Sequence, residues 1–343
     1  MIRLRTIYLV SGLLVAGCGD EAGGTAATDA QVESDAQAEL DAGGDGDAAE
    51  RLRAAIGTFA IELIAPKPAT ETRDAQPGLT SIAGRVYEAM PPSNMQWNAV
   101  EEDGDCRLFE PINPFCDPAC GSGTICAGDG MCVAPPAALD AGTVTFTGLG
   151  DAVLSIDPLP RSFAYQPRST SDLMYPPFAE GDVIGFSAAG DELLPFELSA
   201  RGIAPLELLS PTPIAFDPEA ETLIRWTAAE SSDSSRIIVI VDISHHGGRK
   251  GELVCETGDD GELELPAALV QGLIDLGVAG FPTVTVTREV TSEPLSAAPG
   301  IKLRIFSNVD RELDVPGVTS CNEPGQQDVC PEGQTCQANK LCR

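Results

Sequence analysis

The sequence predicts an all-β protein: a β-sandwich body, built as one large or two small domains, with a short helix and two small modules held by disulfides. Apolar and polar residues alternate with a period of two at many places, which is the pattern of strands with one buried face. Glycine and proline are abundant, at 35 and 27 residues, and aromatic residues make up only 5% of the chain. This composition favours many short strands joined by turns.

Several strands can be placed from the alternation. Residues 143–147 put Val144 and Phe146 on one face and threonines on the other, and residues 283–287 repeat the pattern. Residues 237–241 are aliphatic throughout, which predicts a central strand buried on both faces. Further candidates are residues 59–63, 82–87, 95–100, 183–186, 222–226, 253–255 and 302–306.

One short helix is expected between these strands. Pro266 suits the first position of a helix, and Gly277 suits its end. Four aliphatic residues between them lie at helical spacing: Leu269, Val270, Leu273 and Ile274.

The N-terminus has the pattern of a secretory leader. Arg3 and Arg5 precede an apolar run at residues 7–17, which is too short to cross a bilayer as a helix. The run ends in Leu-Val-Ala-Gly before Cys18 and resembles the bacterial lipobox. The resemblance implies cleavage before Cys18, attachment of acyl chains such as palmitate, and anchoring to a membrane. The alternative is an ordinary secretory signal with a chance cysteine.

The segment after Cys18 is acidic. Residues 19–50 are rich in carboxylates and alanine and contain no basic residue, so we expect residues 18–52 to form a disordered, extended tether. The whole chain has 52 acidic and 21 basic residues, a formal net charge of −31. This charge argues against nucleic acid and anionic lipid surfaces as partners, and favours divalent cations or basic partners.

Cysteines predict disulfides. Eleven are present, and the ten after Cys18 are an even number in an exported chain. Two segments share the spacing C-x2-G-x2-C-x5-C, and an earlier cysteine precedes each. They resemble small knottin-like or EGF-like modules. The candidates are Cys116, Cys120, Cys126 and Cys132 in the first, and Cys321, Cys330, Cys336 and Cys342 in the second. Zinc is the alternative, although most spacings differ from Cys-x2-Cys.

Two bonds within each module leave Cys106 and Cys255 as the remaining pair. A bond between them would bring two acidic, glycine-containing loops together. Calcium suits such loops, and the candidate ligands are Asp103, Asp105, Asp259 and Asp260. The alternative is two solvated turns, because neither loop has the spacing of an EF-hand. Apart from this calcium, we expect no cofactor.

The two histidines, His245 and His246, are expected in a hairpin loop after the aliphatic strand. A metal site with Asp242 is an alternative, but adjacent side chains on an extended chain point in opposite directions. The chain carries no nucleophile-elbow, zinc-protease, P-loop or dinucleotide motif, so we expect no catalysis.

The lipobox, the acidic tether and the two modules together resemble surface lipoproteins of myxobacteria and their relatives. The resemblance implies a cell-envelope location, at the outer membrane or cell surface, and no particular activity. We expect a structural, adhesive or interaction role, with envelope proteins or glycans as partners. The alternatives are a binding module for peptide, glycan or calcium, and a carboxylate- or metal-dependent hydrolase.

The expected organisation follows from these assignments. It comprises a signal peptide at residues 1–17, the lipidated tether at 18–52, N-terminal strands at 53–115, a first cysteine module at 116–135, the main sandwich at 136–312 and a second cysteine module at 313–343.

Overall fold

The structure is a computed structural model. It describes residues 44–69, 74–92, 96–112, 116–150, 152–169, 173–220, 222–230, 235–325 and 329–343. The predictions for the leader, for Cys18 and for most of the tether therefore concern residues outside the described part. Within it, Ala42–Arg343 form one compact unit.

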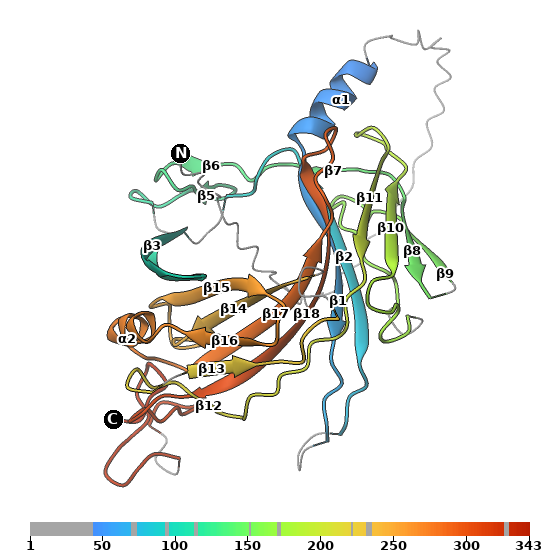
Figure 1. Ribbon diagram of the computed structural model, residues 1–343. Coiled ribbons are helices and arrows are strands. Elements are labelled where there is room, and N and C mark those ends of the chain that lie inside the picture. The colour runs from blue at the N-terminus through green and yellow to red at the C-terminus, as the bar shows by residue number, and fades with distance from the viewer. Residues whose placement is uncertain are drawn as a thin grey trace, which may run out of the picture. The chain divides into compact units, whose positions relative to one another are not determined.

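A ten-stranded sheet runs through this unit (Figure 1). Its order is β3-β4-β15-β14-β17-β18-β1-β2-β7, and β12 also pairs with β18. The strands are β1 (Ile56–Ile64), β2 (Leu79–Tyr87), β3 (Gln96–Asp103), β4 (Cys106–Ile112), β7 (Ala138–Leu139), β12 (Ile214–Ala215), β14 (Arg236–Asp242), β15 (Glu252–Gly258), β17 (Thr283–Thr291) and β18 (Gly300–Asp314). Strands from both ends of the chain thus share one sheet, with β1 parallel to β18.

Three smaller sheets complete the β structure. A four-stranded sheet has the order β11-β10-β8-β9, with β8 (Val144–Leu149), β9 (Ala152–Ile156), β10 (Val183–Ala188) and β11 (Phe196–Arg201). The strand β13 (Thr222–Arg225) pairs with β16 (Glu262–Leu265), and β5 (Ile125–Cys126) pairs with β6 (Cys132–Val133). The predicted all-β class with a sandwich body is confirmed.

Two hydrophobic cores lie on the same face of the large sheet. Ile305 belongs to the first core and Val286 to the second. The register pairs Val290 with Ile305 and Val286 with Val309, so these residues point to one side. The four-stranded sheet covers the first core. The antiparallel pair of β13 and β16, together with α2 (Ala267–Asp275), covers the second, as Figure 1 shows.

The predicted helix is α2, shifted by one residue. Pro266 is its N-cap in an extended conformation, and Leu269, Val270 and Leu273 are its buried residues. Gly277 follows the C-cap with a φ of 99°, a conformation that glycine adopts without a Cβ penalty.

The prediction of a disordered tether is wrong for its last part. Residues 44–52 belong to a second helix, α1 (Gly44–Ala54). Leu52 is buried in the first core, and Asp47 pairs with Arg51 one helical turn away at 3.1 Å. Composition alone did not reveal that this short stretch packs against the body.

The strand predicted at residues 237–241 is central, as expected, but the prediction that both of its faces are buried is wrong. Ile237, Val239 and Val241 are fully buried, whereas Ile238 and Ile240 are partly exposed on the opposite face. Neither core includes residues of that opposite face, which we call the open face.

Candidate functional site

The two cysteine modules have the same structure. The first cysteine is bonded to the third and the second to the fourth in both: Cys116–Cys126 and Cys120–Cys132, then Cys321–Cys336 and Cys330–Cys342. The last two cysteines of each module also face each other across an antiparallel pairing, between β5 and β6 in the first module and as an isolated bridge in the second. Gly123 and Gly333 have φ values of 82° and 84°, so the glycine shared by the two spacings makes the same turn in each. The predicted repeat is therefore a repeat of structure.

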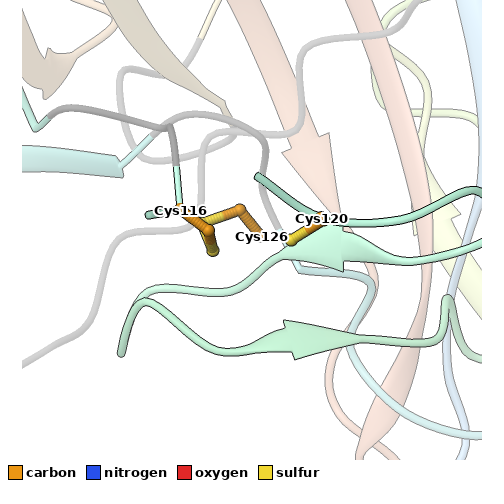
Figure 2. A group of neighbouring side chains, drawn as sticks. All are labelled: Cys116, Cys120 and Cys126. Carbon is orange, nitrogen blue, oxygen red and sulfur yellow. A yellow bond between two sulfur atoms is a disulfide. The ribbon is translucent and has the colours of Figure 1, made fainter. Parts of the chain in front are cut away.

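Sulfur atoms are crowded within each module. Figure 2 shows Cys116, Cys120 and Cys126 close together, and Cys321, Cys330 and Cys342 form a similar group. Zinc binds thiolates, whereas each of these sulfur atoms is bonded to another sulfur. The arrangement favours structural cross-links.

Cys106 and Cys255 are bonded, as the pairing argument predicts, and face each other across β4 and β15. The acidic loops are thereby brought together, but their carboxylates do not converge. Asp103, Asp105 and Asp260 are exposed, whereas Asp259 is completely buried. Among the described residues, the groups of three or more potential metal-binding side chains consist of cysteines alone. The expected four-carboxylate calcium site is not assembled.

Asp259 is instead the partner of a buried arginine. Arg288 donates to both carboxylate oxygens, with its Nε 2.6 Å from Oδ2 and its Nη2 2.9 Å from Oδ1. Trp226 Nε1 and Ser235 Oγ also donate to this carboxylate, at 2.8 and 2.6 Å. Burial opposes ionisation, but the hydrogen bonds and the charge of Arg288 outweigh it and lower the pKa of Asp259. No lone pair is left for a calcium ion.

The histidine loop is the predicted hairpin between β14 and β15. His245 and His246 are exposed, and their ring centroids lie 4.1 Å apart. His245 Nδ1 lies 3.5 Å from Asp242 Oδ2. The second cysteine module packs here, because Gly280 donates to Asn339 O and accepts from Ser320 Oγ. A Cβ on Gly280 would lie 1.9 Å from His245 O, so glycine is required at this contact.

A carboxylate pair lies at the base of that loop. Asp242 and Glu252 are directly opposite each other across β14 and β15. Burial and the neighbouring Asp242 raise the pKa of Glu252 to about 7, while Arg249 acts in the opposite direction. Because its pKa lies near 7, Glu252 changes its charge near neutral pH.

The open face carries an alternating row of charges. Glu256, Arg236, Glu289 and Arg304 come from β15, β14, β17 and β18 in turn. Arg236 lies 3.6 Å from Glu256 and also pairs with Glu289, whose second oxygen is 2.5 Å from Arg304. The Glu289 side chain is only 3% exposed, and two guanidinium groups neutralise it. This row links four strands, and hydrophobic periodicity did not predict it.

Two further cations, Arg85 and Lys302, lie beside Arg304 towards the α1 end of the open face. Thr58 on β1 is directly opposite Arg85 on β2 and Lys302 on β18. Arg304 is two residues beyond Lys302 on the same face. We call Arg85, Lys302 and Arg304 the basic cluster. Among the described residues, neither Arg85 nor Lys302 forms an ion pair.

The basic cluster was not singled out from the sequence. Arg85 precedes Lys302 and Arg304 by more than 200 residues, and the pairing of β1 with both β2 and β18 brings them together. The one available signal was alternation in residues 302–306, which placed Lys302 and Arg304 on the same face of a strand.

Comparisons with known proteins leave the family open. No family model matches the sequence, and no curated protein matches it. One solved structure, of Escherichia coli alpha-2-macroglobulin activated by porcine elastase, aligns over 74% of this chain and 28% of its own, with 10% identity and a TM-score of 0.17. That score is too low to support any conclusion about fold or function. Among the described residues, no helix is both long and apolar enough to span a membrane.

Proposed function

We propose that this chain is an exported lipoprotein anchored through Cys18, with a structural, adhesive or interaction role in the cell envelope and no catalysis. The leader-like N-terminus and its lipobox-like ending are the basis for the anchor. The acidic residues that follow Cys18 fit a spacer between the anchor and the body.

The observation that carries this proposal is the set of five disulfides. All ten cysteines after Cys18 are bonded in pairs, two of them across the large sheet and eight in the modules. Structural disulfides persist in oxidising compartments and are rare where thiols are kept reduced. Cys18 is the one cysteine that these bonds leave over for acylation.

The test is replacement of the proposed lipid acceptor. Cys18→Ala should abolish incorporation of labelled palmitate and move the protein from the detergent phase to the aqueous phase. Intact mass of the wild-type protein should show loss of residues 1–17 and added acyl chains. The double variant Cys116→Ala, Cys126→Ala is the control, because it removes two other cysteines and should stay acylated. A Cys18→Ala protein that remains acylated and membrane-bound contradicts the proposal.

A second measurement addresses the location. Protease added to intact cells should cleave the body if it faces the exterior, and should cleave it only after the outer membrane is permeabilised if it faces the periplasm. Recovery of the wild-type protein in the cytoplasmic fraction, with its cysteines reduced, would overturn the envelope assignment.

A further inference from the structure

The basic cluster is a local exception in an acidic protein. The chain has 52 acidic and 21 basic residues, so most cations have a carboxylate available nearby. Arg236, Arg225 and Arg107 are indeed paired with glutamates. Arg85 and Lys302 have no such partner among the described residues, although only the width of β1 separates them.

Within the part of the chain that the structure describes, Arg85 has one hydrogen-bond partner. Its Nη1 donates to Tyr87 Oη at 3.3 Å, and its guanidinium carbon lies 5.9 Å from the centre of the Tyr87 ring. Its Nε is buried and has no hydrogen-bond partner. The buried Nε is out of reach of an external ligand, but the two terminal nitrogen atoms of a guanidinium carry four further N–H donors, and an oxyanion from outside the chain would accept from these.

The surroundings fit an extended ligand. Arg304 stacks on Phe306 at 4.2 Å from the ring centre and is fixed by Glu289. Between the cations, the residues of the face are small: Thr58, Ala60 and Ala83. Arg85 and Lys302 lie two strand spacings apart, roughly 10 Å between backbones, so a polymer could lie across β1 and place anionic groups near both.

We propose that the basic cluster binds an anionic polysaccharide, through carboxylate or sulfate groups that contact Arg85 and Lys302. This inference rests on the proposed envelope location, where such polymers are accessible, and it names a partner for the interaction role. A thin polymer strand can reach these cations individually, whereas a flat anionic membrane would meet the net negative charge of the whole protein.

The test is binding of the detergent-solubilised full-length protein to polygalacturonate and to dextran sulfate, with neutral dextran as reference. At about 50 mM NaCl, we expect binding to at least one charged polymer and none to dextran, with affinity falling at least tenfold by about 200 mM NaCl. The double variant Arg85→Gln, Lys302→Gln should lose at least tenfold in affinity. Vesicles of phosphatidylglycerol should bind the Cys18→Ala protein, which lacks the proposed anchor, no better than vesicles of phosphatidylcholine do.

The matched control is the double variant Arg249→Gln, Lys250→Gln. It makes the same change in net charge at two exposed residues of the histidine loop, and it should bind within about twofold of wild type. Lys302→Gln alone, at an exposed position, should show a smaller loss and keeps the test valid if the Arg85 change unfolds the protein. The proposal would be overturned by equal losses in both double variants, by wild-type binding to neither charged polymer, or by preferential binding of the Cys18→Ala protein to the phosphatidylglycerol vesicles. A Cys18→Ala protein that remains acylated would contradict the anchor and leave the polymer result unaffected, so the two proposals fail separately.

Discussion

Arg288 is among the largest fully buried side chains, and Asp259 is its one ion-pair partner within the described ranges. Arg288 also donates hydrogen bonds to the backbone carbonyl groups of Ala204, Pro205 and Thr227. Its terminal nitrogen atoms therefore bind backbone segments that lie over the large sheet. Opposite it, Ser307 accepts a hydrogen bond from Leu206 N and donates one to Leu63 O. These two residues form a polar boundary between the two cores.

Breaking this pair should be costly. Arg288→Met leaves the Asp259 carboxylate buried without its counter-charge, and we expect the free energy of unfolding to fall by about 3–5 kcal/mol. Arg225→Met is the control, because Arg225 and Glu262 form an ion pair whose side chains are 57% and 63% exposed. That change should cost less than about 1 kcal/mol. Urea denaturation of both variants measures the difference. Similar losses in the free energy of unfolding would show that the buried pair stabilises the fold no more than the exposed pair does.

Glu252 should make stability depend on pH. Its pKa rises from an ordinary value of 4.5 to about 7 on folding, so the folded state binds the proton more tightly. Stability should therefore be highest below about pH 4.5, as far as this group is concerned, and decline as the pH rises through 7. Glu252→Gln removes the ionisation, and at pH 8 it should be more stable than wild type by on the order of 2 kcal/mol, with little difference at pH 5.

The control for Glu252 is Glu264→Gln on β16, where the side chain is exposed. Thermal midpoints at pH 5 and pH 8 provide the comparison. A gain at pH 5 as large as that at pH 8 would show that the effect does not come from ionisation.

At the scale of elements, the β3–β4 hairpin is attached to the sheet through β15 only. The Cys106–Cys255 bond joins β4 directly to β15 and closes a sequence separation of 149 residues. In the chain-entropy account, a bond that closes so long a loop restricts the unfolded chain strongly. The bonds inside the modules close separations of 10 to 15 residues and lie outside both main cores.

Removing the long-range bond should therefore affect the body more than removing a module bond. We expect Cys106→Ala, Cys255→Ala to lower the free energy of unfolding by about 2–5 kcal/mol, and hydrogen exchange to increase first in β3 and β4. The double variant Cys116→Ala, Cys126→Ala should leave exchange in β14, β17 and β18 unchanged. Equal loss of protection in those three strands in both double variants would contradict this assignment.

At the scale of the whole molecule, β18 connects the two halves of the body. Its fifteen residues pair with β1 near their start and with β12 at their end, and they contribute to both cores. The sequence indicated only residues 302–306 of this strand, because charged residues at its C-terminal end interrupt the apolar alternation. The expected boundaries at residues 115 and 312 therefore do not separate structural units, because β1–β4 share a sheet with β14, β15, β17 and β18, and β18 continues to Asp314.

The sequence by itself determined the all-β class, most strand positions, the helix α2, the repeated modules and the Cys106–Cys255 pair. Most of these features follow from periodicity, turn residues and cysteine spacing within short segments of the chain. The Cys106–Cys255 pair follows by elimination once the cysteines of each module are paired with one another. Only the tertiary structure decided that Asp259 turns inward to Arg288, that residues 44–52 form a helix, and that Arg85 and Lys302 meet across β1. The two side-chain arrangements depend on strand order, and the helix depends on the burial of Leu52 in a core built from strands distant in sequence. The period of apolar residues within one segment encodes none of these three features.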